Sequence, residues 1–185
     1  MQNTTQKFAN PGPLGLSAFG LTTVLLNVHN SGFFPLSTVI ISMGIFYGGI
    51  AQVIAGIMAF RQGKTFPATA FTSFGFFWIG LVAIWLLPTI GGVQAASGDF
   101  LAVYLGMWGI FAFCMTCALK GAPFMLKVVF VSLDLLFLFL VLGLTVNASF
   151  IPIAGYVGLF CGASALYTGM AELVNEQHGR TVWPI

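Results

Sequence analysis

Six long runs of hydrophobic residues, separated by short polar segments, dominate the pattern along this 185-residue chain. The runs are continuous rather than alternating, which excludes the strands of a membrane barrel. Each run is close to the roughly 20 residues that a helix needs to cross a bilayer. Because a helix satisfies its own backbone groups in lipid, the pattern predicts an all-α integral membrane protein, a bundle of six transmembrane helices. The expected spans lie near residues 13–30, 38–60, 66–88, 100–119, 124–146 and 151–173.

Composition agrees with this interpretation. Hydrophobic residues make up 58% of the chain and charged residues only 5%, whereas a soluble domain carries about 25% charged residues. Most of the surface must therefore face lipid. The connections between the runs are short, so we expect a single six-helix membrane domain over residues 1–185.

The positive charges predict the orientation of the helices. With the expected spans, all six lysines and arginines fall on one side of the membrane: Lys7, Arg61, Lys64, Lys120, Lys127 and Arg180. The opposite connections, residues 30–37, 89–99 and 147–150, carry none. The positive-inside rule places both termini in the cytoplasm, and we expect the chain to lie in the cytoplasmic (inner) membrane. The positive charge is small and scattered, so we expect no nucleic-acid partner.

Residues that could support catalysis or metal binding are sparse. His29 and His178 fall on opposite faces of the predicted bundle, so they cannot share a metal or a haem. Cys114 and Cys117 form a Cys-x-x-Cys pattern, but no further ligands accompany them, and packing within a helix explains them. We therefore expect no enzyme activity, no cofactor and no metal site.

Uncharged polar side chains form a sparse trace through the apolar spans. Gln52 lies about 13 Å from the cytoplasmic end of its span, at 1.5 Å per residue. Asn27, Tyr47 and Thr72 lie within other parts of the predicted bundle. Such groups either join helices through hydrogen bonds or line a narrow, weakly polar path. The sequence leaves both interpretations open.

Two carboxyl groups are candidates for proton coupling. Asp134 lies seven positions after Lys127, roughly 10 Å further into the fifth span. An ionisable group at that depth costs a few kcal/mol, so it should face the bundle interior or water. A carboxyl capped by a hydroxyl, with a purely structural role, is the alternative. Glu172, near the cytoplasmic end of the sixth span, is the second candidate, although its position also suits an interfacial charge.

Three motifs carry a resemblance to a known family. Residues 10–16 read Asn-Pro-Gly-Pro-Leu-Gly-Leu, residues 43–52 read Met-Gly-Ile-Phe-Tyr-Gly-Gly-Ile-Ala-Gln, and residues 69–73 read Thr-Ala-Phe-Thr-Ser. The end of the chain, from Asn175 to Thr181, adds a fourth similar segment. With these motifs the sequence resembles the acetate uptake transporter family, and within it the bacterial succinate–acetate permeases.

The resemblance implies a fold and a path. Members of the family form six-helix protomers in a hexameric ring, each protomer with its own pore, and transport acetate or, in some cases, succinate. The family pore narrows at positions that correspond to Phe19, Phe74 and Leu133. Phe74 departs from the tyrosine of similar permeases and lacks its hydroxyl. The remaining candidates for the substrate path are Asn10, Asn27, Tyr47, Gln52, Thr72 and Ala165.

Spacing gives an independent reason to group the three constriction residues. Each lies six or seven residues beyond the start of an odd-numbered span, about 9–10 Å into the membrane. The periodicity by itself favours a role in the hydrophobic core, and it is the family resemblance that favours a constriction. Transport of acetate and related small carboxylates, channel-like or proton-coupled, is thus the leading hypothesis. A channel for a small neutral solute, such as urea or a protonated acid, is the alternative, while a sensory protein or a membrane redox enzyme would need features that the sequence lacks.

Overall fold

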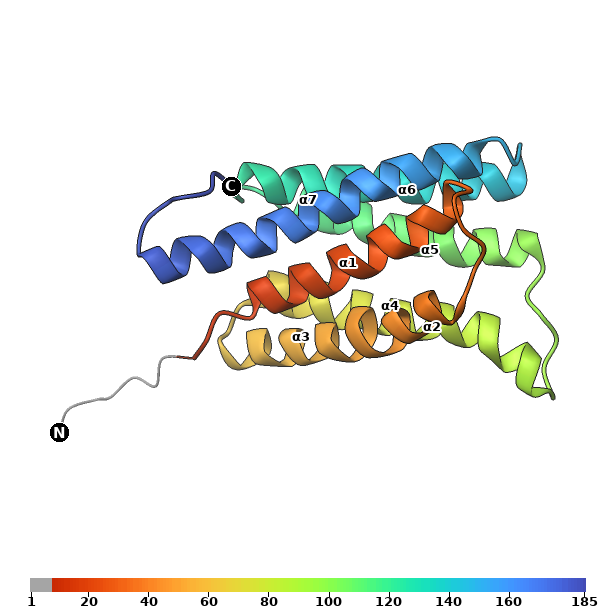
Figure 1. The fold of residues 1–185 in the computed structure, drawn as a ribbon, viewed down its shortest axis with the longest axis horizontal. Helices are drawn as coiled ribbons and strands as arrows, with labels where there is room; N and C mark the ends of the chain where they lie inside the picture. The colour runs from red at the N-terminus through yellow and green to blue at the C-terminus, as the bar shows by residue number, and fades with distance from the viewer. Residues whose placement is uncertain (1–7) are drawn as a thin grey trace.

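The computed structural model describes residues 8–185. This part of the chain forms long, roughly antiparallel helices joined by short loops (Figure 1). Lys7, one of the cations used to orient the chain, lies outside the described residues. No strand occurs between residues 8 and 185. The helical elements are α1 (Gly12–Asn30), α2 (Thr38–Ile45), the π-helical η1 (Phe46–Ala51), α3 (Gln52–Arg61), α4 (Thr65–Ile90), α5 (Gly98–Cys117), α6 (Phe124–Thr145) and α7 (Phe150–His178).

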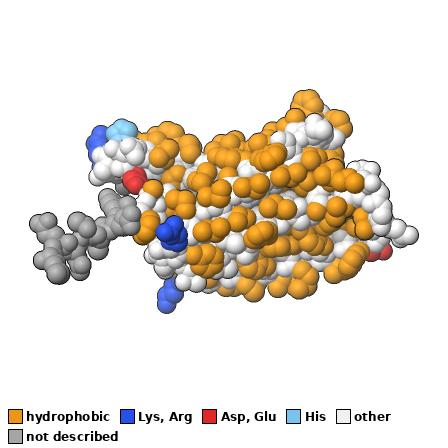
Figure 2. All heavy atoms as spheres, turned by 90° about the horizontal axis from the view of Figure 1, so that it is seen from below, with side chains coloured by type: hydrophobic (Ala, Val, Ile, Leu, Met, Phe, Trp, Pro, Cys, Tyr) orange, Lys and Arg blue, Asp and Glu red, His pale blue; other side chains and the backbone are white. Residues whose placement is uncertain are grey.

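Five helical segments are long and apolar enough to cross a membrane: α2 with η1 and α3, then α4, α5, α6 and α7. The sixth long helix, α1, spans 19 residues, and its glycines and asparagines make it less apolar than the others. Hydrophobic side chains cover the long side of the molecule that Figure 2 shows, while the lysine and arginine side chains on this face lie at one end. The chain is therefore a multi-pass membrane protein.

Helices α1, α4 and α6 line the centre of the bundle. Helix α7 packs against both α1 and α6, α3 packs against α4 and α1, and α5 packs mainly against α6. The central three helices bring Phe19, Phe74 and Leu133 into one hydrophobic core cluster. Because these helices are the first, third and fifth long segments of the bundle, all three run in the same direction along it.

Glycines allow α1 and α7 to approach closely. A Cβ atom at Gly20 would lie 2.7 Å from the carbonyl oxygen of Gly162, and a Cβ at Gly162 would lie equally close to that of Gly20. A Cβ at Gly158 would overlap the side chain of Asn27. Small residues that bring helix backbones together in this way stabilise membrane bundles. Gly158 and Gly162 thus serve packing within one chain.

The second long segment differs from a regular helix at its centre. Between Phe46 and Ala51 the helix widens into one π-helical turn, which the sequence pattern did not predict. The adjacent glycines of this turn contact other helices: a Cβ at Gly48 would meet Thr22, and one at Gly49 would meet Ile79. The wide turn directly precedes Gln52, and π-helical turns occur often at functional sites.

The largest difference from the expected span boundaries is at the end of the chain. Helix α7 continues to His178, beyond the expected end near residue 173. It ends where Gly179 takes a left-handed conformation (φ +63°), which glycine adopts without steric cost. Helix α5 begins and ends two residues before the expected span. Hydropathy could not locate the end of α7, because its last turns are polar and extend past the apolar segment.

Candidate functional site

A cavity of about 360 Å³ opens at the end of the bundle where α1 begins. We call it the Asn10 cavity. Its lining comes mainly from α1, α4 and α6, and the polar groups on it are Asn10, Gln52, Lys64 and Glu172. The rest of the wall is apolar and rich in phenylalanine. Charge is therefore confined to the mouth, and the deeper part offers very few polar contacts.

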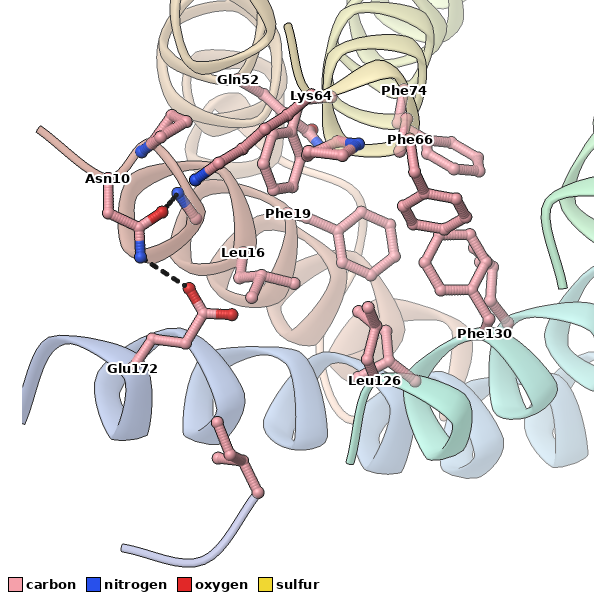
Figure 3. A pocket seen from close by; sticks show the side chains of 18 residues that line it. Asn10, Leu16, Phe19, Gln52, Lys64, Phe66, Phe74, Leu126, Phe130 and Glu172 are labelled. Atoms are coloured by element: carbon pink, nitrogen blue, oxygen red, sulfur yellow. Dashed lines mark hydrogen bonds between the residues drawn. The ribbon is translucent and has the colours of Figure 1, made fainter. Parts of the chain in front are cut away.

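A hydrogen-bonded group of side chains forms the mouth of the Asn10 cavity (Figure 3). The Asn10 amide Nδ2 donates to Glu172 Oε2 at 3.2 Å, and its Oδ1 accepts from the backbone N–H of Gly12 at 3.0 Å. The second of these bonds satisfies the Gly12 N–H, which lies in the first turn of α1 and therefore has no acceptor within that helix. The Lys64 side chain reaches across the mouth toward Asn10. A carboxylate, an amide, a cation and the start of a helix thus meet at one point.

Gln52 lies deeper in the same cavity. Its side chain is only 1% exposed, and its Oε1 atom has no hydrogen-bond partner among residues 8–185. A buried acceptor without a donor costs free energy, so Gln52 Oε1 is free to accept a hydrogen bond from a donor inside the cavity, whereas a carboxylate can bind only the Nε2 side of this amide. The amide Nδ2 and Nε2 groups of asparagine and glutamine are donors that a carboxylate can accept from.

A second cavity, of about 150 Å³, opens from the opposite end of the bundle, and we call it the Asn27 cavity. Asn27 is 1% exposed; its Nδ2 donates to the Thr23 carbonyl at 2.8 Å, and its Oδ1 accepts from Asn30 Nδ2 at 3.0 Å. These bonds fix the two amides on one wall. The other walls are aromatic and aliphatic, from α4, α5 and α6.

The two cavities have three lining residues in common: Phe19, Phe74 and Leu133. Each is at most 6% exposed, and the rings of Phe19 and Phe74 lie 5.9 Å apart at 55°. Phe74 is held from behind by the rings of Phe111 at 5.5 Å and Trp108 at 6.1 Å. An apolar constriction, with one residue from each of α1, α4 and α6, therefore separates a cavity at one end from a cavity at the other.

Residues 1–184 match the profile described as the GPR1/FUN34/yaaH family. The chain belongs to the GPR1/FUN34/yaaH family. The family resemblance read from the motifs is thus confirmed.

Named members of the GPR1/FUN34/yaaH family include transporters of small carboxylates. The succinate-acetate/proton symporter SatP of Escherichia coli K12 is 54% identical to this chain, over 100% of this chain and 98% of SatP. The solved structure of the bacterial acetate channel SatP superposes with a TM-score of 0.95 at 53% identity, over 97% of this chain and 99% of that one. Acetate permease A of Emericella nidulans is 33% identical and covers 97% of this chain, which spans 66% of that protein.

The structure brings together some of the residues singled out for the path and leaves others apart. Asn10 and Gln52 line the Asn10 cavity, and Asn27 lines the second one. Three others line neither cavity: Tyr47, Thr72 and Ala165. Thr72 faces Gly56, where an added Cβ would overlap its hydroxyl, and Ala165 lies in the hydrophobic core.

The two carboxyl candidates lie in different places. Glu172 is at the mouth of the Asn10 cavity, whereas Asp134 lies on the side of α6 that faces α5. There Asp134 Oδ2 accepts a hydrogen bond of 2.7 Å from the Thr116 hydroxyl. Asp134 lines a separate groove between α5 and α6 rather than either cavity. Adjacent residues on a helix point about 100° apart, so Leu133 faces the constriction and Asp134 does not.

Sequence reasoning missed several residues that line the cavities. In the sequence, Lys64 served only as one of the positive charges that orient the helices. It directly precedes α4, and from there its side chain can extend over the mouth. Phe66 and Phe130 form an edge-to-face pair at 5.3 Å on the wall of the Asn10 cavity. Asn30 donates a hydrogen bond to Asn27, which lies three residues before it on α1. This spacing is visible in the sequence. The aromatic pair joins α4 to α6, and no local pattern indicates such a contact.

Proposed function

We propose that this chain carries acetate and related small carboxylates, succinate included, across the membrane without catalysing a reaction. The path runs from the Asn10 cavity through Phe19, Phe74 and Leu133 to the Asn27 cavity. The observation that carries this proposal is that, among residues 8–185, the cavities from the two ends share those three lining residues and no others. The names of the similar proteins, a succinate-acetate/proton symporter and an acetate permease, support the choice of permeant.

The chemistry of the walls suits a small monocarboxylate. Its anionic end can accept hydrogen bonds from the amides of Gln52 or Asn27, while its methyl end tolerates the apolar ring. Hydrated inorganic ions find nothing at that ring to replace their water. A few neutral donors bind an anion weakly, which suits flux because a permeant must leave as readily as it arrives.

The test of this function is uptake of radiolabelled acetate into liposomes that contain the purified protein, with and without an imposed pH gradient. We expect uptake above that of empty liposomes, with competition by unlabelled succinate. Accumulation that collapses with the gradient would identify proton symport, and equilibration regardless of the gradient would identify a channel. Equal uptake in the presence and absence of protein would contradict the proposal.

Glu172 is the group that we favour for proton coupling. Its carboxylate lies at the mouth that a substrate carboxylate must pass, and the charged groups of residues 8–185 that act on it are Lys64 and Glu176. Within this part of the chain one cation therefore faces two carboxylates, so an arriving anion meets repulsion unless Glu172 holds a proton. Asp134 is the second candidate, and from its site between α5 and α6 it acts on the path only across α6.

Replacement of Glu172 by glutamine is expected to flatten the pH dependence of acetate uptake. Glu172→Gln keeps the size and the hydrogen bond with Asn10 but cannot ionise. Wild-type uptake should rise as the external side is acidified, by up to about tenfold per pH unit if transport is strictly coupled to one proton. Uptake by Glu172→Gln should change by less than about twofold per pH unit. Uptake by Glu176→Gln, a change at an exposed neighbour, should keep the wild-type steepness with pH, with the profile displaced along the pH axis because one charge that acts on Glu172 is lost. If Asp134→Asn alone loses the pH dependence, the coupling belongs to Asp134.

We further propose that the chain is one six-span domain of the cytoplasmic (inner) membrane, with both termini and the Asn10 cavity on the cytoplasmic side. The gathering of cations at that end supports this orientation (Figure 2).

Six copies are proposed to form a ring with one path in each protomer. Chemical cross-linking in native membranes, with bands up to the hexamer, is the measurement that checks the ring.

Single cysteines report the orientation directly. In a background without the three native cysteines, a cysteine at Ser31 or Ser97 should react with an impermeant maleimide added outside intact cells. A cysteine at Gln62 should react only after the membrane is permeabilised, because it lies between Arg61 at the end of α3 and Lys64 just before α4. Labelling of position 62 in intact cells would reverse the proposed orientation.

A further inference from the structure

The segment that follows α7 folds back against that helix. Gly179 reverses the chain with its left-handed conformation, and residues 181–185, which we call the return segment, run back along α7 (Figure 1). These residues belong to no helix or strand. Their position must therefore be held by side chains rather than by a regular backbone pattern.

Asn175 and Tyr167 hold the return segment in place. Asn175 Oδ1 accepts from the backbone N–H groups of Val182 at 2.7 Å and Trp183 at 2.9 Å, and its Nδ2 donates to the Trp183 carbonyl at 2.8 Å. The Tyr167 hydroxyl donates to the Pro184 carbonyl at 2.9 Å, and its ring stacks on Trp183 with centroids 5.8 Å apart and planes 7° from parallel. Every hydrogen bond recorded for the Asn175 side chain is made to this segment.

The end of the return segment reaches the Asn10 cavity. Ile185 lines that cavity together with Asn10, Lys64 and Glu172. Ile185 and Pro184 also line a second, more open hollow together with Phe124 and Met125 at the start of α6. The segment therefore extends from α7 to the start of α6 and supplies an apolar part of the wall near the charged mouth.

We propose that the return segment is a rim that sets the size of solute able to pass the mouth of the Asn10 cavity. On the proposed function, in which this cavity is the vestibule of the carboxylate path, the rim is a size filter in series with the constriction and separate from it. A small solute passes with the rim in place, whereas a bulky solute passes only when the bonds to Asn175 and Tyr167 open.

The test measures access to the cavity and needs no transport. Ala70 lines the Asn10 cavity but not the Asn27 cavity, and it is buried. In detergent-solubilised protein without the native cysteines, the reaction rate of Ala70→Cys is measured with a small and a bulky methanethiosulfonate reagent. Addition of Asn175→Ala should raise the rate for the bulky reagent by about tenfold at the least and by about a hundredfold at the central value, the size expected when three hydrogen bonds of ordinary net strength are lost. The rate for the small reagent should change much less.

Graded and matched variants separate a rim from a general loss of structure. Asn175→Asp keeps the acceptor for two N–H groups and should have a smaller effect, and Tyr167→Phe keeps the ring stacking and should have the smallest. Asn147 is a matched control, because its Oδ1 accepts from the Ser149 N–H at 2.9 Å next to the other end of α7. Asn147→Ala should leave both rates unchanged. Equal rates for the bulky reagent with and without Asn175→Ala, or an equal increase for both reagents, would overturn the rim. Either result would leave the proposed transport function untouched.

Discussion

Leu133→Ala is expected to raise the flux of succinate relative to acetate by about tenfold or more, since even one methylene group in an apolar pocket changes discrimination by 10- to 200-fold. Leu133 is 3% exposed and lines both cavities, so its truncation widens the constriction itself. The rings of Phe19 and Phe74 remain in place. Competition between labelled acetate and labelled succinate in liposomes measures the ratio.

A core leucine away from the path provides the control for this prediction. Leu119 is 6% exposed, close to the burial of Leu133, but lines neither cavity. Both alanine variants should lose packing free energy, about 2–5 kcal/mol for a buried leucine. Only Leu133→Ala should change the selectivity. An unchanged ratio at normal protein levels would show that Leu133 is ordinary core.

Gln52→Leu is expected to lower acetate uptake, measured as the maximal rate divided by KM, by about 10- to 100-fold. A hydrogen bond to a charged group contributes roughly 1.5–3 kcal/mol, and each 1.4 kcal/mol is a factor of about ten. Leucine has nearly the shape of glutamine but cannot donate to a carboxylate. Because Gln52 Oε1 has no partner within the described part of the chain, its removal should not destabilise the fold.

Thr72→Val is the matched control for Gln52→Leu. The Thr72 hydroxyl is also buried without a partner among the described residues, but Thr72 lines neither cavity. If unpartnered polar groups matter only where they face the path, Thr72→Val should retain wild-type uptake. Equal losses in the two variants would indicate a structural rather than a binding role for Gln52.

The helical architecture was predictable because a bilayer imposes it. Continuous apolar runs allow only helices, and the runs indicated each long segment to within a few residues apart from the end of α7. The wide turn at Phe46–Ala51 was not predictable, because it coincides with contacts to other helices and not with any change in hydropathy. Gly48 and Gly49 allow Thr22 and Ile79, on two other helices, to approach. Hydropathy carries no information about such contacts.

The site was predictable only in part, for the same reason. The direction of a side chain around a helix follows from spacing once one neighbour is known, so Leu133 at the constriction implies that Asp134 points elsewhere. Whether Asp134 meets water, lipid or a hydroxyl depends on which helix lies beside α6, and the structure shows Thr116 of α5. The bond between Asn10 and Glu172 joins residues 162 positions apart. No sequence pattern connects them.

The central claim is that permeating solutes pass between Phe19, Phe74 and Leu133, and blocking that point tests it most directly. In a background without the native cysteines, Leu133→Cys is labelled to completion with a methanethiosulfonate reagent, and acetate uptake is measured before labelling, after labelling and after reduction. Leu135→Cys, on the same helix but 43% exposed on its outer side, is the control. We predict that labelling abolishes uptake at position 133, that reduction restores it, and that labelling at position 135 has no effect. Full uptake by protein completely labelled at position 133 would contradict the proposed path.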